Sequence, residues 1–594
     1  MKMNALILAN SASSAYREGF ERVLPYLEHF GVPLAWCDLA RDPLPEDLAA
    51  YPLLVIAHRQ LDPTGTRLAP GGRQRLLQAV AQGSGLVSFD PRLPLPGEIG
   101  IEKKFARGLK STRAQTITFQ RAHAITARHT SGEQLPLASD LILPALPAAP
   151  ESVLLHAGGS PLLAASALGQ GKIVRWATSD WMYSGILGPL AGLDDVFWRA
   201  LAWAARKPFA MRGLPPLVTM RVDDVAGTGA RWGQTPLYWL EAAQACGFKS
   251  WLGLFIFNLE EATLQQLRPH LMEGRATAFP HAFGRPPRGQ PDALPYFDRG
   301  FPTRAVEYDE FIYYDHQSQQ SWSDREAARG LATVDEWYAA HAPLPISPYA
   351  IPHWGEVGSN VMAHIHDRWG CDLIAKYNDC DVPLANPIPW LVAGPFRRYE
   401  KPGTAFFDPA RRGQRPVYYA DFVNFGQRQF FLCFTEIRNN AGYEWAPDNN
   451  IDATVSRGLT QLRRAFESMA LPVLFTHETD YIYKIQPETW AEEIKQIAAG
   501  IRGYDPIYVT PDEGIRYVRA TQTSRLEACE YHPDNNEINA RFSGRADRST
   551  YFYVFADAGD ELVSQLVETP AFDDGLEIRQ RISRDKNRKV KEHV

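Results

Sequence analysis

The chain has 594 residues, of which 45% are hydrophobic and 22% charged, a composition typical of a folded globular protein and not of a disordered one. This length exceeds what one hydrophobic core organises, so we expect about two to four domains. The 62 basic and 68 acidic residues give a net charge of −6, which argues against a nucleic-acid partner.

The N-terminal apolar run, residues 4–8, is too short for a secretory signal and is typical of a first buried strand. No apolar segment approaches the roughly 20 residues needed to cross a bilayer. The six cysteines are scattered without a CxxC pair, which favours a reducing compartment. We therefore expect a cytoplasmic protein with no membrane partner, with export by another route as the alternative. The oligomeric state is not indicated.

Residues 1–210 alternate short apolar runs with helical patterns, which predicts an open parallel sheet covered by helices. This α/β region resembles the glutamine-amidotransferase-like (flavodoxin-like) fold. In catalytic members a cysteine occupies the sharp turn after a central strand. The matching turn here, residues 87–91, has no cysteine, and Cys37 has no evident histidine partner. The resemblance therefore implies a non-catalytic accessory domain.

A proline-containing boundary at 207–216 leads into a second unit, residues 211–519. Strand-like and helix-like segments alternate through it, which predicts a distorted (β/α) barrel. The expected strands are 217–222, 250–257, 276–280, 346–351, 372–377, 417–422, 430–434, 471–476 and 507–509. The expected helices are 236–246, 324–340, 455–469 and 487–500. Residues 520–594 alternate polar and apolar positions between turns, which predicts a small antiparallel β domain with a charged tail.

Polar residues end several of the barrel strands: the aspartates Asp223 and Asp224, and the histidines His281, His353 and His477. Paired carboxylates repel each other, so such a pair usually serves a cation or a catalytic task. The carboxyl ends of barrel strands meet at one mouth. A carboxylate with imidazoles can bind a divalent ion, and a second carboxylate can accept a proton from water. The pattern therefore favours an enzyme that performs metal-assisted hydrolysis.

Residues 219–225 resemble the first motif of the polysaccharide deacetylases, the NodB-like carbohydrate esterases. The resemblance implies that Asp223 is the general base and Asp224 a metal ligand. The segment 280–285 resembles the second motif, which makes His281 a ligand. The segment 475–478 resembles the last motif, which makes His477 the general acid, with Glu478 or Asp480 setting its orientation.

The chain departs from this family at the second motif, where Arg285 replaces the second histidine. The third ligand must then come from elsewhere, with His353 as the first choice and His316 as the second. A degenerate site that binds metal poorly is a further alternative. Zinc is the expected cofactor, because it suits histidine and aspartate ligands, although other divalent ions bind similar sets.

The expected function is deacetylation of an N- or O-acetylated sugar, with a carbohydrate as the substrate. One alternative is a glycosidase on a related barrel, using Asp223 or Asp224 with Glu436 and no metal. A second alternative is a carbohydrate-binding protein with a decayed site, which the arginine at the expected ligand position favours.

Overall fold

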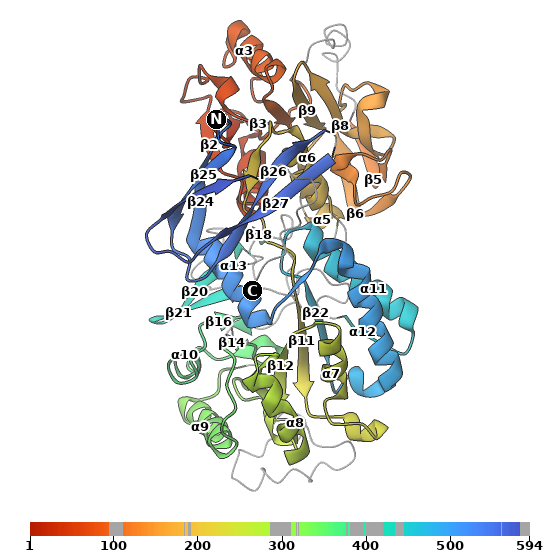
Figure 1. Ribbon diagram of the computed structural model, residues 1–594, viewed down its shortest axis with the longest axis vertical. Helices are drawn as coiled ribbons and strands as arrows, with labels where there is room; N and C mark the ends of the chain where they lie inside the picture. The colour runs from red at the N-terminus through yellow and green to blue at the C-terminus, as the bar shows by residue number, and fades with distance from the viewer. Residues whose placement is uncertain are drawn as a thin grey trace.

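The structure is a computed structural model with a mixed α/β architecture, and its chain is elongated along one axis (Figure 1). It describes residues 1–93, 111–182, 184–187, 192–284, 310–316, 318, 320–375, 378–379, 397–398, 417–418, 420–433, 445–559 and 561–582. The N-terminal sheet occupies one end, and the strand that carries the two aspartates points towards the other end (Figure 1).

The N-terminal region forms a nine-stranded sheet in the order β2-β1-β3-β4-β9-β8-β7-β5-β6. The first five strands in this order run parallel, and all except the half-buried edge strand β2 are almost entirely buried. These strands are β2 Leu34–Asp38, β1 Ala5–Ala9, β3 Leu53–Ile56, β4 Gly85–Ser88 and β9 Gly171–Trp176. The helices of this region are α1 Tyr16–Glu18, α2 Leu24–His29, α3 Ala69–Ala81, α5 Ser184–Leu187 and α6 Asp194–Ala204.

The expectation of an all-parallel sheet is wrong for its second half, where every strand pairs antiparallel with its neighbour. These strands are β8 Ser160–Leu168, β7 Val153–Ala157, β5 Thr112–Phe119 and β6 Gln134–Leu143. Short turns connect several of them, and such connections produce antiparallel pairing. Cys37 lies at 4% exposure, and burial raises the pKa of its thiol to about 11, which keeps it protonated and a poor nucleophile.

The central region is built on a five-stranded parallel sheet in the order β13-β12-β11-β22, with β23 also paired to β11. Its strands are β11 Leu217–Val225, β12 Ser250–Phe255, β13 Ala276–Ala282, β22 Val473–His477 and β23 Ile507–Tyr508. Each one lies where a strand is expected from the sequence. The helices are α7 Tyr238–Ala245, α8 Glu261–Met272, α9 Asp324–Ala340, α10 Met362–Trp369, α11 Ile451–Glu467, α12 Pro487–Ile501 and α13 Pro511–Thr523.

The expected barrel does not close among the described residues. The parallel ladder stops at β13 on one side, and the next strands form a separate sheet in the order β14-β16-β21-β20. In that sheet β14 and β16 are two residues long, and β20 runs antiparallel to β21. Short strands and a reversal of direction interrupt the continuous parallel pairing that a closed barrel requires. The strands of this sheet are β14 Tyr349–Ala350, β16 Leu373–Ile374, β20 Ala420–Phe425 and β21 Arg428–Cys433. Two further two-stranded sheets consist of β15 Glu356–Val357 with β17 Asn378–Asp379, and of β18 Arg397–Arg398 with β19 Val417–Tyr418.

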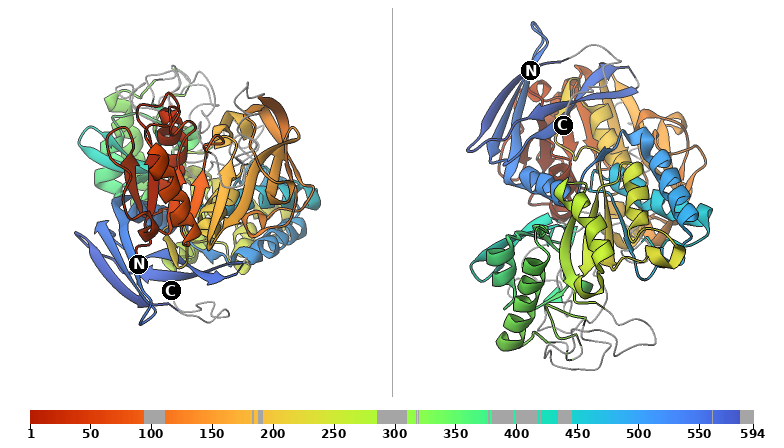
Figure 2. Two further views of the ribbon diagram at one scale, coloured as in Figure 1. Left: turned by 90° about the horizontal axis from the view of Figure 1, so that it is seen from above. Right: turned by 60° about the horizontal axis from the view of Figure 1, so that its bottom comes forward.

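The C-terminal region is antiparallel β structure, as expected, in two sheets ordered β24-β25-β28 and β10-β26-β27. Its strands are β24 Ser524–His532, β25 Glu537–Gly544, β26 Thr550–Ala558, β27 Glu561–Thr569 and β28 Leu576–Arg581, with β10 Phe209–Met211 from the first boundary. Met3 donates its backbone N–H to the Cys529 carbonyl, and the blue C-terminal strands lie beside the red N-terminal segment (Figure 2). Both ends of the chain therefore contribute to one assembly of strands.

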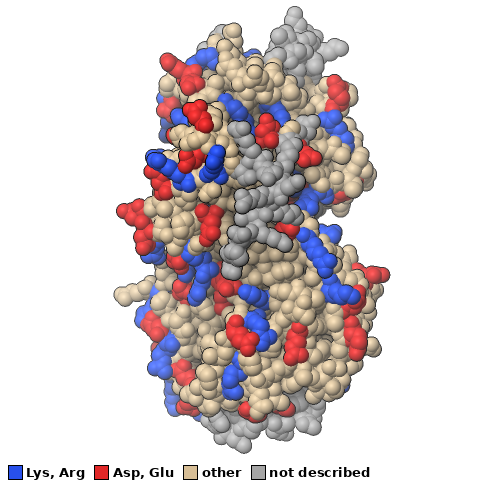
Figure 3. All heavy atoms as spheres, in the orientation of Figure 1, with Lys and Arg blue, Asp and Glu red and all other residues tan. Residues whose placement is uncertain are grey.

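Lys and Arg side chains are interspersed with Asp and Glu side chains over the described part of the face in Figure 3. Neither sign forms a continuous patch in this view, which agrees with the near balance of charge in the sequence. Among the described residues, no helix combines the length and apolarity that crossing a membrane requires.

Candidate metal centre

The two aspartates end β11 in an irregular piece of strand. The ladder between β11 and β12 shifts register between Val222 and Val225, and Asp224 has φ +56°. Successive side chains of a regular strand point to opposite faces, but a bulge re-aims one of them. Both carboxylates therefore reach one imidazole: the Nε2 atom of His281 lies 3.6 Å from Asp223 Oδ2 and 3.5 Å from Asp224 Oδ1.

His281 lies on β13 at a second irregularity, because the ladder to β12 passes from the pair Leu254–Pro280 to the pair Phe255–Ala282. Its Nδ1 atom is 2.6 Å from the carbonyl oxygen of Ile351. A carbonyl only accepts, so Nδ1 carries the proton and Nε2 presents its lone pair to the aspartates in the neutral ring. This is the outer contact that fixes the tautomer of metal-binding histidines.

His353 comes from the short helical turn His353–Gly355 that follows β14. Its Nδ1 atom lies 3.0 Å from His281 Nε2 and 3.4 Å from Asp224 Oδ1, and its Nε2 atom lies 3.2 Å from Glu310 Oε1. The buried carboxylate of Glu310 thus contacts the far nitrogen of the ring and directs Nδ1 towards Asp224.

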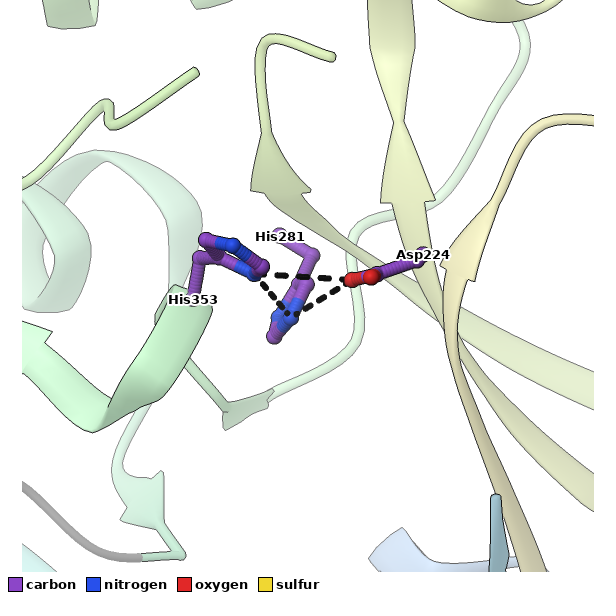
Figure 4. Close-up of side chains that lie close together, drawn as sticks. All are labelled: Asp224, His281 and His353. Carbon is purple, nitrogen blue, oxygen red and sulfur yellow. Dashed lines mark hydrogen bonds and ion pairs between the residues drawn. The ribbon is translucent and has the colours of Figure 1, made fainter. Parts of the chain in front are cut away.

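The three side chains Asp224, His281 and His353 form a cluster whose ligand atoms all lie within 4.8 Å of one another. Figure 4 shows the three groups pointing towards one another from separate elements. The distances between their nearest polar atoms are 3.0, 3.4 and 3.5 Å, close to the roughly 3.3 Å that separates neighbouring ligands around tetrahedral zinc. Two imidazoles and a carboxylate are also a ligand set that zinc accepts, so the residues fit the expected ion.

The three side chains of this cluster are at most 3% exposed, so water screens their charges little and the charges shift one another's pKa. Burial alone raises the pKa of Asp224, but His353 and other imidazoles outweigh it and hold that pKa well below its usual range. Burial lowers the pKa of His281 to about 4. For His353, Asp224 outweighs burial and raises the pKa to about 9. Asp224 therefore favours positive charge beside it, either as a proton or as a metal ion.

The second carboxylate has a partner of its own. Asp223 is 2% exposed, and its two oxygens lie 2.7 Å and 2.5 Å from the Nε and terminal nitrogen of Arg221. Burial raises the pKa of Asp223, but the guanidinium outweighs it and lowers the pKa below the usual range. The Arg221 guanidinium keeps this carboxylate ionised and fixes its orientation, so it can accept a proton, and its lowered pKa makes it a weaker base than an ordinary aspartate.

His477 is the last residue of β22, and its Cα is paired in register with that of Asp223. It is partly exposed, whereas the two aspartates are buried. Its imidazole is among the groups that lower the pKa of both aspartates, after burial and closer partners. The chain therefore brings this expected general acid to the same strand ends as the cluster.

The suggestion that Glu478 orients His477 is wrong. Glu478 follows the last residue of β22, and its carboxylate is fully buried. It accepts hydrogen bonds from the loop after β11 and from the Trp239 indole, at 2.6–3.0 Å. Its role is to hold that loop. Asp480 lies half-buried in the following turn, and its orientation of His477 stays a prediction.

The other expected residues have different outcomes. His316, the second choice for the third ligand, is absent from the cluster found among the described residues; its Nδ1 bonds Glu356 Oε2 at 2.7 Å. Arg285 and Glu436 lie outside the described residues. Two contacts were missed from the sequence. Arg221 could have been recognised as a charge on an apolar strand two residues before Asp223, but Glu310 lies in a segment without any periodic signal.

Comparison with known proteins adds no family assignment, because neither a protein-family model nor a curated protein matches the chain. Two cytoplasmic proteins of Salmonella typhimurium have solved structures that match 30% and 35% of this chain, at 19% and 14% identity and TM-scores of 0.22 and 0.25. The matches cover 89% and 100% of those proteins. A β-galactosidase from Bacillus circulans matches 36% of this chain and 33% of its own, at 15% identity and TM-score 0.22.

Likenesses at these scores carry no argument about fold or activity. The resemblance to polysaccharide deacetylases therefore rests on the motifs alone, and so does the resemblance of the N-terminal region to glutamine amidotransferases. The β-galactosidase belongs to the class that the alternative function names, the glycoside hydrolases.

Proposed function

We propose that this chain is a metal-dependent hydrolase that removes acetyl groups from an acetylated carbohydrate. The observation that carries the proposal is the buried cluster of Asp224, His281 and His353 beside a second, arginine-paired carboxylate. Arg221 accounts for the charge of Asp223, and the buried Asp224 carboxylate then faces two imidazoles, one of which keeps an unprotonated Nε2 directed at it.

Asp224, His281 and His353 would hold a divalent ion, most suitably zinc. When bound, such an ion supplies Lewis acidity for an acyl oxygen and for water. Asp223 then takes a proton from the attacking water, and Arg221 keeps that carboxylate ionised and oriented. His477 gives a proton to the departing amine or alcohol. Water and the acetylated sugar are consumed, and acetate and the free amine or hydroxyl are formed.

Replacement of Asp223 by Asn separates chemistry from metal binding. The variant should lose acetate release by at least about 100-fold while its zinc content, measured by elemental analysis, stays that of the parent. Asn keeps the size of the side chain, so the fold is checked by thermal unfolding. An Asp223→Asn enzyme that hydrolyses acetylated substrate normally would contradict the assigned base.

A glycoside hydrolase is the second candidate function. It requires two carboxyl groups about 5–9 Å apart, one of them with a raised pKa, and no metal. Asp223 and Asp224 both have lowered pKa values, so the acid would have to come from another residue such as Glu436. Release of reducing sugar that persists in a chelator, with no acetate formed, would favour this candidate.

A further inference from the structure

The residue that follows His353 has an unusual backbone. Trp354 has φ +57° and ψ 4°, inside the turn that begins with His353. A bulky side chain in this left-handed region is a genuine outlier, and such strain persists mainly where the surrounding structure enforces it, often at ligand sites. The strain lies one residue from the proposed metal ligand.

The Trp354 side chain is also unusual in its exposure. At 55% it is the only exposed tryptophan among those that the structure describes; the others are buried or half-buried. An indole left in water forgoes the stabilisation that burial would give it. The chain therefore carries both a strained backbone and an exposed ring at the edge of the cluster.

The imidazole of His316 lies beside the Trp354 ring. The His316 ring lies 4.8 Å from that of Trp354, edge to face, and stacks at 4.6 Å and 7° on Phe311. Its Nδ1 is bound to Glu356, which is 1% exposed. A buried carboxylate that fixes an imidazole in this way sets both its orientation and its tautomer. The centre of the Phe311 ring lies 5.0 Å from that of His353. Phe311 therefore connects the His316 ring to the proposed metal ligand.

We propose that Trp354 and His316 form a sugar-binding subsite beside the metal cluster, and this inference rests on the proposed function for its place in the reaction. A pyranose ring presents an apolar face of C–H groups and a rim of hydroxyls. The exposed indole matches the face, because aromatic rings bind apolar surfaces well. The oriented imidazole matches a hydroxyl, because it can donate or accept a hydrogen bond. The structure assigns the pair to substrate positioning and not to proton transfer.

The test is isothermal titration calorimetry of the zinc-loaded full chain with chitotriose, N-acetylchitotriose and acetylated xylotriose. At least one should bind the parent, and Trp354→Ala should weaken its binding by roughly tenfold. Trp354→Phe keeps an aromatic face and should retain most of the affinity. Phe20→Ala removes a ring of similar exposure, 49%, far along the chain, and should leave binding unchanged.

A Trp354→Gly variant distinguishes a ligand role from a packing role. Glycine adopts this φ without strain, so its thermal midpoint should equal or exceed that of the parent while sugar binding is lost. A clearly lower midpoint would make the ring a packing element and overturn the proposal. So would equal affinity of Trp354→Ala and the parent, or no binding of any of the three sugars to the parent.

The outcomes also separate the subsite from the proposed reaction. If the parent binds a sugar through Trp354 but releases no acetate, the proposed function fails and the subsite stands. If the parent releases acetate while Trp354→Ala has an unaltered KM, the subsite fails and the proposed function stands.

Discussion

Arg221 and Asp223, two residues apart on β11, form a buried bidentate ion pair with distances of 2.7 and 2.5 Å. Residues i and i+2 of a strand project to the same face, so the local chain alone brings this pair together. The guanidinium also lies 4.0 Å from the centre of the Phe475 ring. The proposed general base is thus anchored by its own strand and by a neighbour on β22.

Replacing Arg221 by Met should leave Asp223 as a buried, uncompensated carboxylate. Loss of one partner of such a pair lowers the free energy of unfolding by about 3–5 kcal/mol. The lowered pKa of Asp223 means that its contribution to stability exists above the unfolded pKa and disappears as pH falls through the folded one. The variant should lose this contribution, and the acidic limb of its kcat/KM profile should move to higher pH. Urea unfolding and a pH–rate series measure both effects.

The double variant Arg221→Met/Asp223→Asn is the matched control. It removes both charges, so it should recover most of the lost stability while remaining inactive. A double variant as unstable as Arg221→Met alone would show that the arginine acts through packing instead of through its charge.

Glu478 predicts a second effect on stability. Its carboxylate receives three backbone N–H groups of residues 226–228, the Thr228 hydroxyl and the Trp239 indole. Glu478→Gln removes the charge and places an NH2 group against donors, which should cost about 2–4 kcal/mol. Glu336→Gln, the same change at an exposed position of α9, should change stability by no more than about 0.5 kcal/mol. Equal losses in chemical denaturation would refute the proposed loop anchor.

The sequence predicts much of the central region because its signals are local. An apolar run that ends in Asp223 and Asp224 marks β11, and polar residues after later runs mark His281, His353 and His477. The cluster could be anticipated because parallel strands share one edge. In the first sheet, two-residue connections at 158–159 and 169–170 are local signals for antiparallel pairing that were missed from the sequence. By contrast, the open central sheet depends on pairings between distant segments. No local pattern specifies those pairings.

The contacts that orient the site residues were harder to predict from the sequence. Glu478 lies in the turn just after β22, so the alternation of strand residues does not predict whether its carboxylate faces His477 or the loop after β11. Glu310 contacts His353 across 43 residues of sequence, and its own neighbourhood carries no periodicity. Such contacts become visible only after the chain is folded.

Gly253 provides a test of how His281 is positioned. A Cβ atom at residue 253 would lie 3.0 Å from Cγ and 3.1 Å from Cβ of His281. Gly253→Ala should therefore displace the imidazole and weaken zinc affinity by about 10- to 100-fold, as expected for loss of a supporting contact. In Gly330→Ala the nearest atom is 3.6 Å away, so affinity should not change. Competition with a chromogenic chelator measures both; unaltered affinity in Gly253→Ala would contradict this packing constraint.

His129 predicts a pH dependence of stability away from the site. Burial lowers its pKa, but Asp195 and Glu133 outweigh burial and raise the pKa to about 9. Because the folded value exceeds the unfolded one, the stabilisation is fully present below about pH 6.5 and is lost as pH rises towards 9. The total should be at most about 3 kcal/mol. Thermal midpoints from pH 6 to pH 9.5 should fall in the parent and stay flatter in His129→Gln; parallel curves would reject the assignment.

The central claim is that Asp224, His281 and His353 bind one divalent ion. Elemental analysis of the zinc-reconstituted, dialysed chain tests it most directly. The parent, Asp223→Asn and His316→Gln should each retain about one zinc per chain, whereas Asp224→Asn, His281→Gln and His353→Gln should retain almost none. A parent without stoichiometric metal, or a His353→Gln variant that keeps its zinc while His316→Gln loses it, would contradict the account.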